Sequence, residues 1–352
     1  MSQDEDFGAQ GGDPRRMVGG VSIDLSTCVN FYGPPPAVLE LLDGSIRAQD
    51  LQIHPYPAAE RMEAAYARHL GVPACELIAG RGTTEFIWAL SRQVPHERVA
   101  VPLPAYTDYL KAFPGRGFEG EQIPSIEQIG AALASASLVI VSNPHNPSGV
   151  ALAPRALIEA ARSHPLATFV VDESYVDFVA DPAAATVVGA DVDNLVVLRS
   201  PSKFWGIAAT RVGVAWCRDR ERLQALLGRR ETWPISGLDV AVAEVAMKSV
   251  DWAERARLDL ARDAQWLGEQ LRELPGTLVE QDVGVHYRCL ICERPGALAA
   301  RMAGHGVAVR ALGRAHGVRP GALRILAPLP HQRPAVKAAV HALAEQRSLS
   351  AA

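Results

Sequence analysis

The fold is decided by one stretch, residues 197–213, which reads Val197-Leu-Arg-Ser-Pro-Ser-Lys-Phe-Trp-Gly-Ile-Ala-Ala-Thr-Arg-Val-Gly213. An apolar run gives way there to hydroxyls, a lysine and an arginine. Ser200, Ser202 and Arg211 can clamp a phosphate dianion through charge-assisted hydrogen bonds. Lys203 beside such a clamp can be desolvated, which favours the neutral amine, a nucleophile toward an aldehyde. Phosphate, aldehyde and lysine together indicate pyridoxal phosphate, although the stretch taken alone also suits a solvated loop.

A second stretch places an acid at the end of an apolar, strand-like run, since residues 169–175 read Phe169-Val-Val-Asp-Glu-Ser-Tyr175. A carboxylate at Asp172 can keep a pyridine nitrogen protonated, which makes the ring an electron sink. Tyr175 can donate a hydrogen bond to the phenolic oxygen of that ring. An ordinary strand-end acid that caps a helix gives the same pattern. A metal site at Asp172 and Glu173 is not expected, because no histidine or cysteine lies at ligand spacing.

A third stretch, residues 142–149, reads Ser142-Asn-Pro-His-Asn-Pro-Ser-Gly149 and directly follows an apolar run. Asn146 can donate an amide hydrogen to the same phenolic oxygen. The prolines and the glycine also suit a plain turn. The order of this stretch before the acid and the lysine, each near a strand end, favours the cofactor interpretation.

Two further motifs fit a phosphorylated aromatic cofactor. Gly82, Thr83 and Thr84 follow a strand-like run and open a helix, so that their backbone N–H groups can bind phosphate. Tyr106 follows another such run and can stack on the pyridine. Tyr109, one turn later, equally suits the core.

Strand-like and helical runs alternate over roughly 170 residues, which predicts a mostly parallel sheet covered by helices. Such sheets bind ligands at the carboxyl ends of their strands. The expected strands are 76–79, 98–101, 137–141, 168–171, 194–198 and 212–216. The expected helices in this part of the chain are 58–70, which stops at Gly71, 84–92 and 154–163.

The pattern changes after residue 234, which predicts a smaller α+β domain. One long helical region is expected over 238–274, then strand-like pieces at 277–280, 287–292, 307–310 and 322–326, and a terminal helix at 334–346. The expected domain organisation is a loose tail (1–20), a segment that lines the active site (21–44), a large cofactor-binding domain (45–240) and a small domain (241–352).

Composition excludes several classes of protein. The 352 residues carry a net charge of −4, so no basic field is available for nucleic acid or anionic lipid. No apolar run reaches the ~20 residues of a membrane span. Five cysteines, an odd number, fit a reducing compartment, and Cys289 and Cys292 have metal or redox spacing without a second pair. The polar, Gly-rich residues 1–20 lack the hydrophobic segment of a signal peptide, so we expect a cytoplasmic protein. Because the two cysteines have no second pair, we expect no metal.

Taken together and in this order, the motifs resemble those of the fold-type I pyridoxal-phosphate enzymes. The likeness is greatest to the branch of histidinol-phosphate aminotransferases and threonine-phosphate decarboxylases, and it runs from Asp24 to Leu343. It implies an α/β fold-type I architecture, with a mostly parallel sheet between helices in a large domain and a smaller α+β domain. It also implies pyridoxal 5′-phosphate as the cofactor and small amino acids and keto acids as substrates.

The resemblance implies a role for each motif. Lys203 would form a Schiff base with the cofactor and move the proton at the substrate Cα. Asp172 would meet the pyridine nitrogen, Asn146 and Tyr175 the phenolic oxygen, and Tyr106 would stack on the ring. The residues implied around the cofactor phosphate are Gly82, Thr83, Thr84, Ser200, Ser202 and Arg211.

Residues 54–57, His54-Pro-Tyr-Pro57, resemble a family segment whose tyrosine reaches the cofactor phosphate of the other subunit. The resemblance therefore implies a homodimer with shared sites and Tyr56 contributed in trans. A turn in front of the helix expected at 58–70 satisfies the sequence equally well.

On the substrate side, Arg324 aligns with the family's arginine for the substrate carboxylate, which its planar fork matches. Arg310 resembles the arginine that contacts a distal phosphate in this branch; a surface arginine at a strand end is the equal alternative. Residues 24–35 resemble the segment that gates the substrate, so Asn30 and Tyr32 are expected to contact it.

Several residues depart from the family pattern near the expected place of the substrate. Cys28 and Phe31 stand where Asn and Pro are usual, Ala209 stands for a Gly, and Gly237 stands for an Asn. Because the cofactor motifs are intact, these departures predict a substrate other than histidinol phosphate.

Several functions fit the motifs unequally. An aminotransferase is the first, and a decarboxylase or other lyase of a (phospho)amino acid on the same scaffold is the alternative, because the choice depends on which Cα bond lies perpendicular to the ring. A non-catalytic ligand sensor is remote, since Lys203 is intact and residues 1–20 leave no room for a DNA-binding helix-turn-helix. An unrelated nucleotide-binding enzyme would require a Gly-x-Gly-x-x-Gly or Walker loop, and neither is present.

Overall fold

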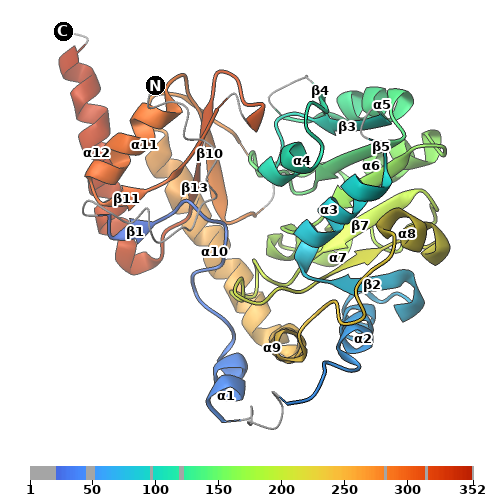
Figure 1. The fold of residues 1–352 in the computed structure, drawn as a ribbon. Helices are drawn as coiled ribbons and strands as arrows, with labels where there is room; N and C mark the ends of the chain where they lie inside the picture. The colour runs from blue at the N-terminus through green and yellow to red at the C-terminus, as the bar shows by residue number, and fades with distance from the viewer. Residues whose placement is uncertain are drawn as a thin grey trace. The chain divides into compact units, whose positions relative to one another are not determined.

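The computed structural model describes residues 21–44, 52–95, 98–118, 123–280, 284–313 and 316–350 (Figure 1). The tail expected over 1–20 lies outside them. The chain separates into a large unit, Val29–Pro144 with Leu152–Ala256, and a small unit formed by the described residues of Met1–Cys28, His145–Ala151 and Arg257–Ala352. The expected ranges 45–240 and 241–352 differ from these units, because 145–151 groups with the C-terminal part.

The large unit is built on a seven-stranded sheet of order β2-β8-β7-β6-β5-β3-β4. Strands β3 to β7 pair in parallel, while β8 pairs antiparallel with both β7 and β2. The strands are β2 (Leu77–Gly80), β3 (Val99–Pro102), β4 (Gly117–Phe118), β5 (Leu138–Ser142), β6 (Thr168–Asp172), β7 (Leu195–Arg199) and β8 (Gly213–Trp216). The predicted, mostly parallel sheet is confirmed, and each predicted strand is shifted by at most one residue at either end.

Every residue of β5, β6 and β7 is buried, as expected of central strands that are covered on both faces. The helices of the large unit are α1 (Pro36–Gly44), α2 (Ala58–Leu70), α3 (Gly82–Gln93), α4 (Thr107–Ala112), α5 (Ile126–Ser135), α6 (Pro154–Ser163), α7 (Pro182–Ala185), α8 (Arg220–Leu227) and α9 (Gly237–Lys248). Helix α2 ends as predicted at Gly71, whose φ of 69° is the left-handed conformation that glycine adopts at low cost. Single 3₁₀ turns lie at Ala74–Glu76 and Val176–Phe178.

The single helix predicted over 238–274 is wrong. The structure divides this region into α9 and α10 (Val250–Leu271), with Ser249 between them at φ −83° and ψ 64°. The Ser249 hydroxyl donates to the carbonyl of Val245 at 3.2 Å. A serine that bonds the preceding turn offers the backbone an alternative to continued helix, and the apolar periodicity does not reveal this.

The small unit contains a four-stranded antiparallel sheet of order β12-β13-β10-β9 and a parallel pair, β1 with β11. The strands are β1 (Ile23–Asp24), β9 (Thr277–Leu278), β10 (Tyr287–Ile291), β11 (Val307–Ala308), β12 (Arg310–Leu312) and β13 (Ala322–Leu326). Its other helices are α11 (Pro295–Gly304) and α12 (Arg333–Ser350), with a 3₁₀ turn at Pro330–Gln332. Among the described parts of the chain, none of the helices combines the length and the apolar character needed to cross a membrane.

Candidate cofactor site

In the large unit, the functional residues cluster where neighbouring parallel strands end. Ser142 at the end of β5 lies opposite Asp172 at the end of β6, and Asp172 lies opposite Leu198 in β7. The segments that leave β6 and β7 therefore start from the same edge of the sheet. The acid and the lysine-bearing stretch therefore begin side by side, at the edge where such sheets bind ligands.

Asp172 is buried and accepts hydrogen bonds on both carboxylate oxygens. One carboxylate oxygen accepts a hydrogen bond from the Tyr109 hydroxyl at 2.8 Å. The other accepts from the backbone N–H of Ser174 at 3.0 Å and from its hydroxyl at 2.5 Å. Burial raises the pKa of Asp172, while the bonds from Ser174 and Tyr109 and the positive charge of Lys203 oppose the rise. The carboxylate is thus held in one orientation by donors on both of its oxygens.

Tyr109 and Ser174 are functional residues that sequence reasoning missed. Tyr109 is 1% exposed, and its ring meets Tyr106 edge to face at 5.5 Å. The only signal for it was its place one helical turn after Tyr106, which equally predicts a core residue. Ser174, two residues after Asp172, has the spacing of a side chain that bonds its own strand-end acid, which the sequence pattern by itself leaves unassigned.

The residues expected around a phosphate come from segments that lie against one another. A Cβ atom built on Gly82 would stand 3.1 Å from Nη2 of Arg211, and one built on Gly213 would stand 3.0 Å from the Cα of Gly82. Gly82, at φ +74°, therefore admits the guanidinium to the start of α3. Thr83 comes within 3.4 Å of the Ser174 hydroxyl, so the start of α3 also meets the segment after β6.

The two serines of the Lys203 stretch are hydrogen-bonded to each other. The hydroxyls of Ser200 and Ser202 are 2.8 Å apart, and Ser200 donates to the carbonyl of Val212 at 2.8 Å. Hydroxyls, a guanidinium and the first N–H groups of a helix are the donor set that a phosphate monoester prefers. The residues present therefore fit the phosphate of pyridoxal phosphate, as the buried Asp172 fits its pyridinium nitrogen.

Three further predicted cofactor residues, Lys203, Tyr175 and Tyr106, lie near Asp172 or its partner Tyr109. The charge of Lys203 acts on Asp172, and Tyr175, 6% exposed, acts electrostatically on Tyr109. Tyr106 donates to Asp108 at 2.9 Å, and burial, with the Asp108 charge next, raises the pKa of Tyr106. Stacking of Tyr106 and the bond from Tyr175 to the cofactor stay predictions.

In the small unit, Asn146 and Arg324 are joined directly. Arg324 donates to the amide oxygen of Asn146 at 2.7 Å and to the carbonyl of Ser26 at 3.0 Å. Its guanidinium lies 5.8 Å from the centre of the Tyr287 ring, and the Tyr287 hydroxyl donates to the carbonyl of His145 at 2.9 Å. The Asn-Pro turn is therefore tied to β10 and β13, and the amide of Asn146 is oriented with its oxygen toward the guanidinium.

Arg310 and Arg324 are direct partners in the register of β12 with β13. Side chains at directly opposite positions project to the same face of a sheet. Arg310 is 6% exposed, so the alternative of an ordinary surface arginine is excluded for it. One face of this sheet consequently presents two guanidinium side chains.

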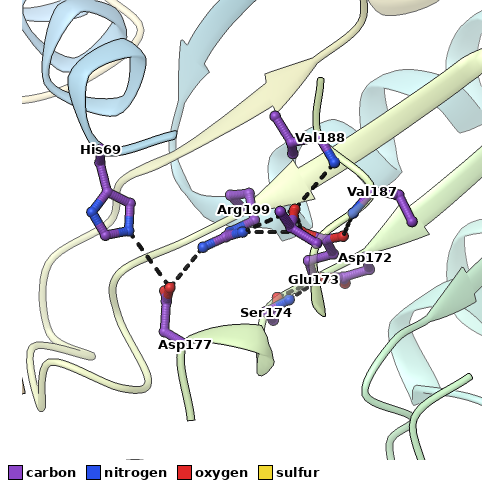
Figure 2. Close-up of polar contacts among 9 residues, drawn as sticks. His69, Asp172, Glu173, Ser174, Asp177, Val187, Val188 and Arg199 are labelled. Atoms are coloured by element: carbon purple, nitrogen blue, oxygen red, sulfur yellow. Dashed lines mark hydrogen bonds and ion pairs between the residues drawn. The ribbon is translucent and has the colours of Figure 1, made fainter. Parts of the chain in front are cut away.

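A buried ionic network anchors the segment between Asp172 and Tyr175 (Figure 2). Arg199 donates to Glu173 at 3.0 Å and to Asp177 at 2.6 Å, and all three side chains are at most 4% exposed. Glu173 also accepts from Thr186 and from the backbone of Val187, at 2.6 and 2.7 Å. Arg199 at the end of β7 thus holds both ends of the turn that follows Asp172 and carries Tyr175.

Arg199→Met is expected to lower the free energy of unfolding by about 3–5 kcal/mol, because it leaves two buried carboxylates without their cation. Arg162→Met is the matched control, since the Arg162–Glu159 pair of the same unit is more than half exposed on both sides and should contribute less than about 1 kcal/mol. Urea denaturation of both variants measures the difference. Equal, small losses would show that Arg199 does not stabilise this turn.

Comparison with known proteins gives a family and a fold. The family model described as aminotransferase class I and II matches residues 22–343. A histidinol-phosphate aminotransferase of Limosilactobacillus fermentum is 32% identical over 258 residues, 69% of this chain and 71% of that protein. Histidinol-phosphate aminotransferase 2 of Archaeoglobus fulgidus is 33% identical over 267 residues, covering 72% and 73%. The threonine-phosphate decarboxylase of Salmonella typhimurium is 26% identical over 286 residues, 77% of each chain.

Solved structures agree on the fold. The histidinol-phosphate aminotransferase from Sinorhizobium meliloti in complex with pyridoxal-5′-phosphate has a TM-score of 0.81 at 21% identity and covers 95% of this chain and 94% of that one. The L-threonine-O-3-phosphate decarboxylase from Porphyromonas gingivalis has a TM-score of 0.78 at 19% identity and covers 92% and 99%. At these identities the likeness concerns the fold alone.

Proposed function

The chain belongs to the class I and II aminotransferase family, and from that premise we propose that it transfers the amino group of a phosphorylated or otherwise anionic amino compound to a keto acid. The protein is a pyridoxal-phosphate-dependent enzyme of fold type I. The observation that carries the proposal is the buried carboxylate of Asp172, oriented by Tyr109 and Ser174 and within electrostatic range of Lys203.

When bound, pyridoxal phosphate supplies an electron sink that weakens the bonds at the substrate Cα. Each residue of the site then has a limited task. Asp172 would hold a proton at the pyridine nitrogen. Lys203 would bind the aldehyde carbon and, once the substrate amine has displaced it, would move the proton from the substrate Cα to that carbon, C4′ of the cofactor. The start of α3 and the hydroxyls of Ser200 and Ser202 would hold the phosphate, with Arg211 supplying the charge.

We propose that the substrate carries two anionic groups. Arg324, tied to Asn146 and to the Ser26 carbonyl, suits a carboxylate because its planar fork is already oriented. Arg310, its partner across β12 and β13, suits a second anion. The relatives are named for histidinol phosphate and threonine phosphate, both phosphate monoesters, which supports a phosphate at Arg310.

The substrate itself is proposed to differ from histidinol phosphate. Cys28, where the family has an asparagine, is 2% exposed and acts electrostatically on Tyr287, whose ring lies against Arg324. A thiol at this position replaces the amide donors and acceptors of an asparagine. A histidinol-phosphate transamination rate typical of a natural substrate would end this part of the proposal.

Decarboxylation is the second candidate, supported by the relative that is named a threonine-phosphate decarboxylase. One experiment separates the two. The loaded protein is mixed with single amino acids and phosphoamino acids, and visible absorbance, keto acid and carbon dioxide are followed through one turnover. If the absorbance of the cofactor attached to Lys203 is lost and keto acid is released, the result supports transamination. If carbon dioxide is released and that absorbance recovers, the result supports the lyase. A protein that never acquires the absorbance contradicts the whole proposal.

Arg324→Gln should raise KM for the amino donor in either reaction, because the substrate carboxylate loses its proposed partner.

We further propose a cytoplasmic homodimer in which Tyr56 binds the cofactor phosphate of the other subunit. Tyr56 is 63% exposed and Ile53 69%, and His54 stacks on Trp233 with ring centres 4.1 Å apart. An exposed, ordered aromatic group of this kind suits an interface between copies.

Sedimentation velocity should give twice the 37.7 kDa of one chain. Tyr56→Phe should keep the dimer but lose a hydrogen bond to a charged group, roughly 1.5–3 kcal/mol, and so weaken cofactor binding about tenfold to a hundredfold. A monomer, or cofactor affinity unchanged in Tyr56→Phe, would contradict the shared site.

A further inference from the structure

Asn30, for which a substrate contact stays a prediction, is bonded to the segment that carries Lys203. Its side-chain amide donates to the carbonyl of Phe204 at 2.9 Å, and its backbone N–H donates to the carbonyl of Lys203 at 2.9 Å. Its amide oxygen accepts from the backbone N–H of Tyr32 at 2.9 Å. Asn30 is 1% exposed, so both polar ends of a buried side chain are engaged within the large unit.

A second contact joins the same two segments three residues further along. A Cβ atom built on Gly206 would stand 2.6 Å from the carbonyl carbon of Gly33 and 3.0 Å from the nitrogen of Pro34. Gly206 has φ +65°, so no other residue suits this close approach of two backbones. The segment from Asn30 to Pro34 therefore follows the Lys203 loop at two points.

The residues that follow Lys203 are also fixed by aromatic packing. Phe204 is fully buried and meets Phe178 edge to face, with ring centres 5.2 Å apart. Trp205 stacks on Trp252 at 5.7 Å. These contacts hold the side chains after Lys203, while Asn30 donates to the carbonyls of Lys203 and Phe204.

We propose that Asn30 is a positioning residue for Lys203, because its side-chain amide holds the carbonyl of Phe204, the next residue, beside the Lys203 carbonyl that its backbone N–H holds. The inference rests on the proposed function of Lys203. Removal of the amide leaves the Phe204 carbonyl buried without this donor and allows the peptide plane to turn. A nucleophile works when it is held ~3–3.5 Å from its target, and a displacement of ~1 Å can cost on the order of 10²-fold in rate.

Asn30→Ala and Asn30→Asp test the inference. Asn30→Asp keeps the acceptor for the Tyr32 N–H but places a carboxylate oxygen against the Phe204 carbonyl. Asn194→Ala is the matched control, since the Asn194 amide is also buried and donates to three backbone carbonyls, of Ala161, His164 and Ala167, at the other end of β7. All three variants lose side-chain amide bonds to the backbone, and only the first two lose one at Phe204, the residue after Lys203.

The first measurement is the rate at which the apoprotein acquires visible absorbance after mixing with pyridoxal phosphate. Both Asn30 variants should be slower than wild type by about tenfold or more, while Asn194→Ala keeps the wild-type rate. In the loaded enzyme kcat should fall by roughly 10²-fold with KM for the donor within a few fold, whichever donor is used. Thermal unfolding of all variants reports how much of each change is loss of stability.

Three results would overturn the inference. A rise in KM of the Asn30 variants that varies with the donor would show that Asn30 contacts the substrate. Asn30 variants that acquire visible absorbance as fast as wild type would show that Asn30 does not influence Lys203. Equal slowing in Asn194→Ala would assign the effect to stability. A wild-type protein that acquires no absorbance would instead contradict the proposed function itself, so the two failures are distinguishable.

Discussion

Lys203→Ala is expected to abolish transamination. The variant loses both the amine that binds the aldehyde carbon and the group that moves the proton at the substrate Cα. Proton transfer by a positioned side chain alone contributes about 10²–10⁴-fold, so the loss should exceed that factor. The protein should still fold, because Lys203 contributes its carbonyl, not its side chain, to the bond with Asn30.

The measurement is single-turnover formation of keto acid from the best donor, together with borohydride trapping of the cofactor on the protein. Wild-type protein should carry the trapped group on the peptide that contains Lys203, and Lys203→Ala should carry none. Lys111→Ala is the matched control, since Lys111 is an exposed lysine near Asp108 and its removal should leave rate and trapping unchanged. Trapping on another lysine in the wild type would contradict the assignment.

Asp172→Asn is expected to lower kcat by about 10²–10³-fold, the usual cost of removing one preorganised electrostatic partner. An amide keeps the shape and the acceptor for Tyr109, but it cannot hold a proton at the pyridine nitrogen. Asp219→Asn is the control, because Asp219 caps α8 by accepting from Arg222 and asparagine caps equally well. Activity of Asp172→Asn within a few fold of wild type would exclude the proposed role.

The same carboxylate gives a direction for the pH dependence. Burial raises the pKa of Asp172, and the proposed role requires the ionised form. In the protein without cofactor, this raised pKa should weaken the binding of pyridoxal phosphate as the pH is lowered through it, at a higher pH than for an exposed aspartate. The pH profile of cofactor affinity should lose this acid limb in Asp172→Asn.

The sequence by itself determined the class of fold and the chemistry of the cofactor end. The apolar runs before the stretches that contain Asp172 and Lys203 became β6 and β7, because strands buried on both faces need continuous apolar side chains. Helix α2 began and ended as predicted, since its periodicity and the stop at Gly71 are local. Polar residues placed just after such strands gather at one edge of any parallel sheet, so their proximity followed from order in the chain.

Tertiary structure alone decided which side chains support those residues. Tyr109 bonds Asp172 across 63 positions and Asn30 bonds the Phe204 carbonyl across 174. The buried pairing of Arg199 with Asp177 likewise joins separate segments. A local pattern records whether a residue suits a core, a turn or a strand end, but the partner of a buried polar group is chosen by packing among distant segments. From local sequence, Tyr109 therefore suits the core and Asn30 suits a substrate contact. Their bonds to Asp172 and to the Phe204 carbonyl are visible only in the folded chain.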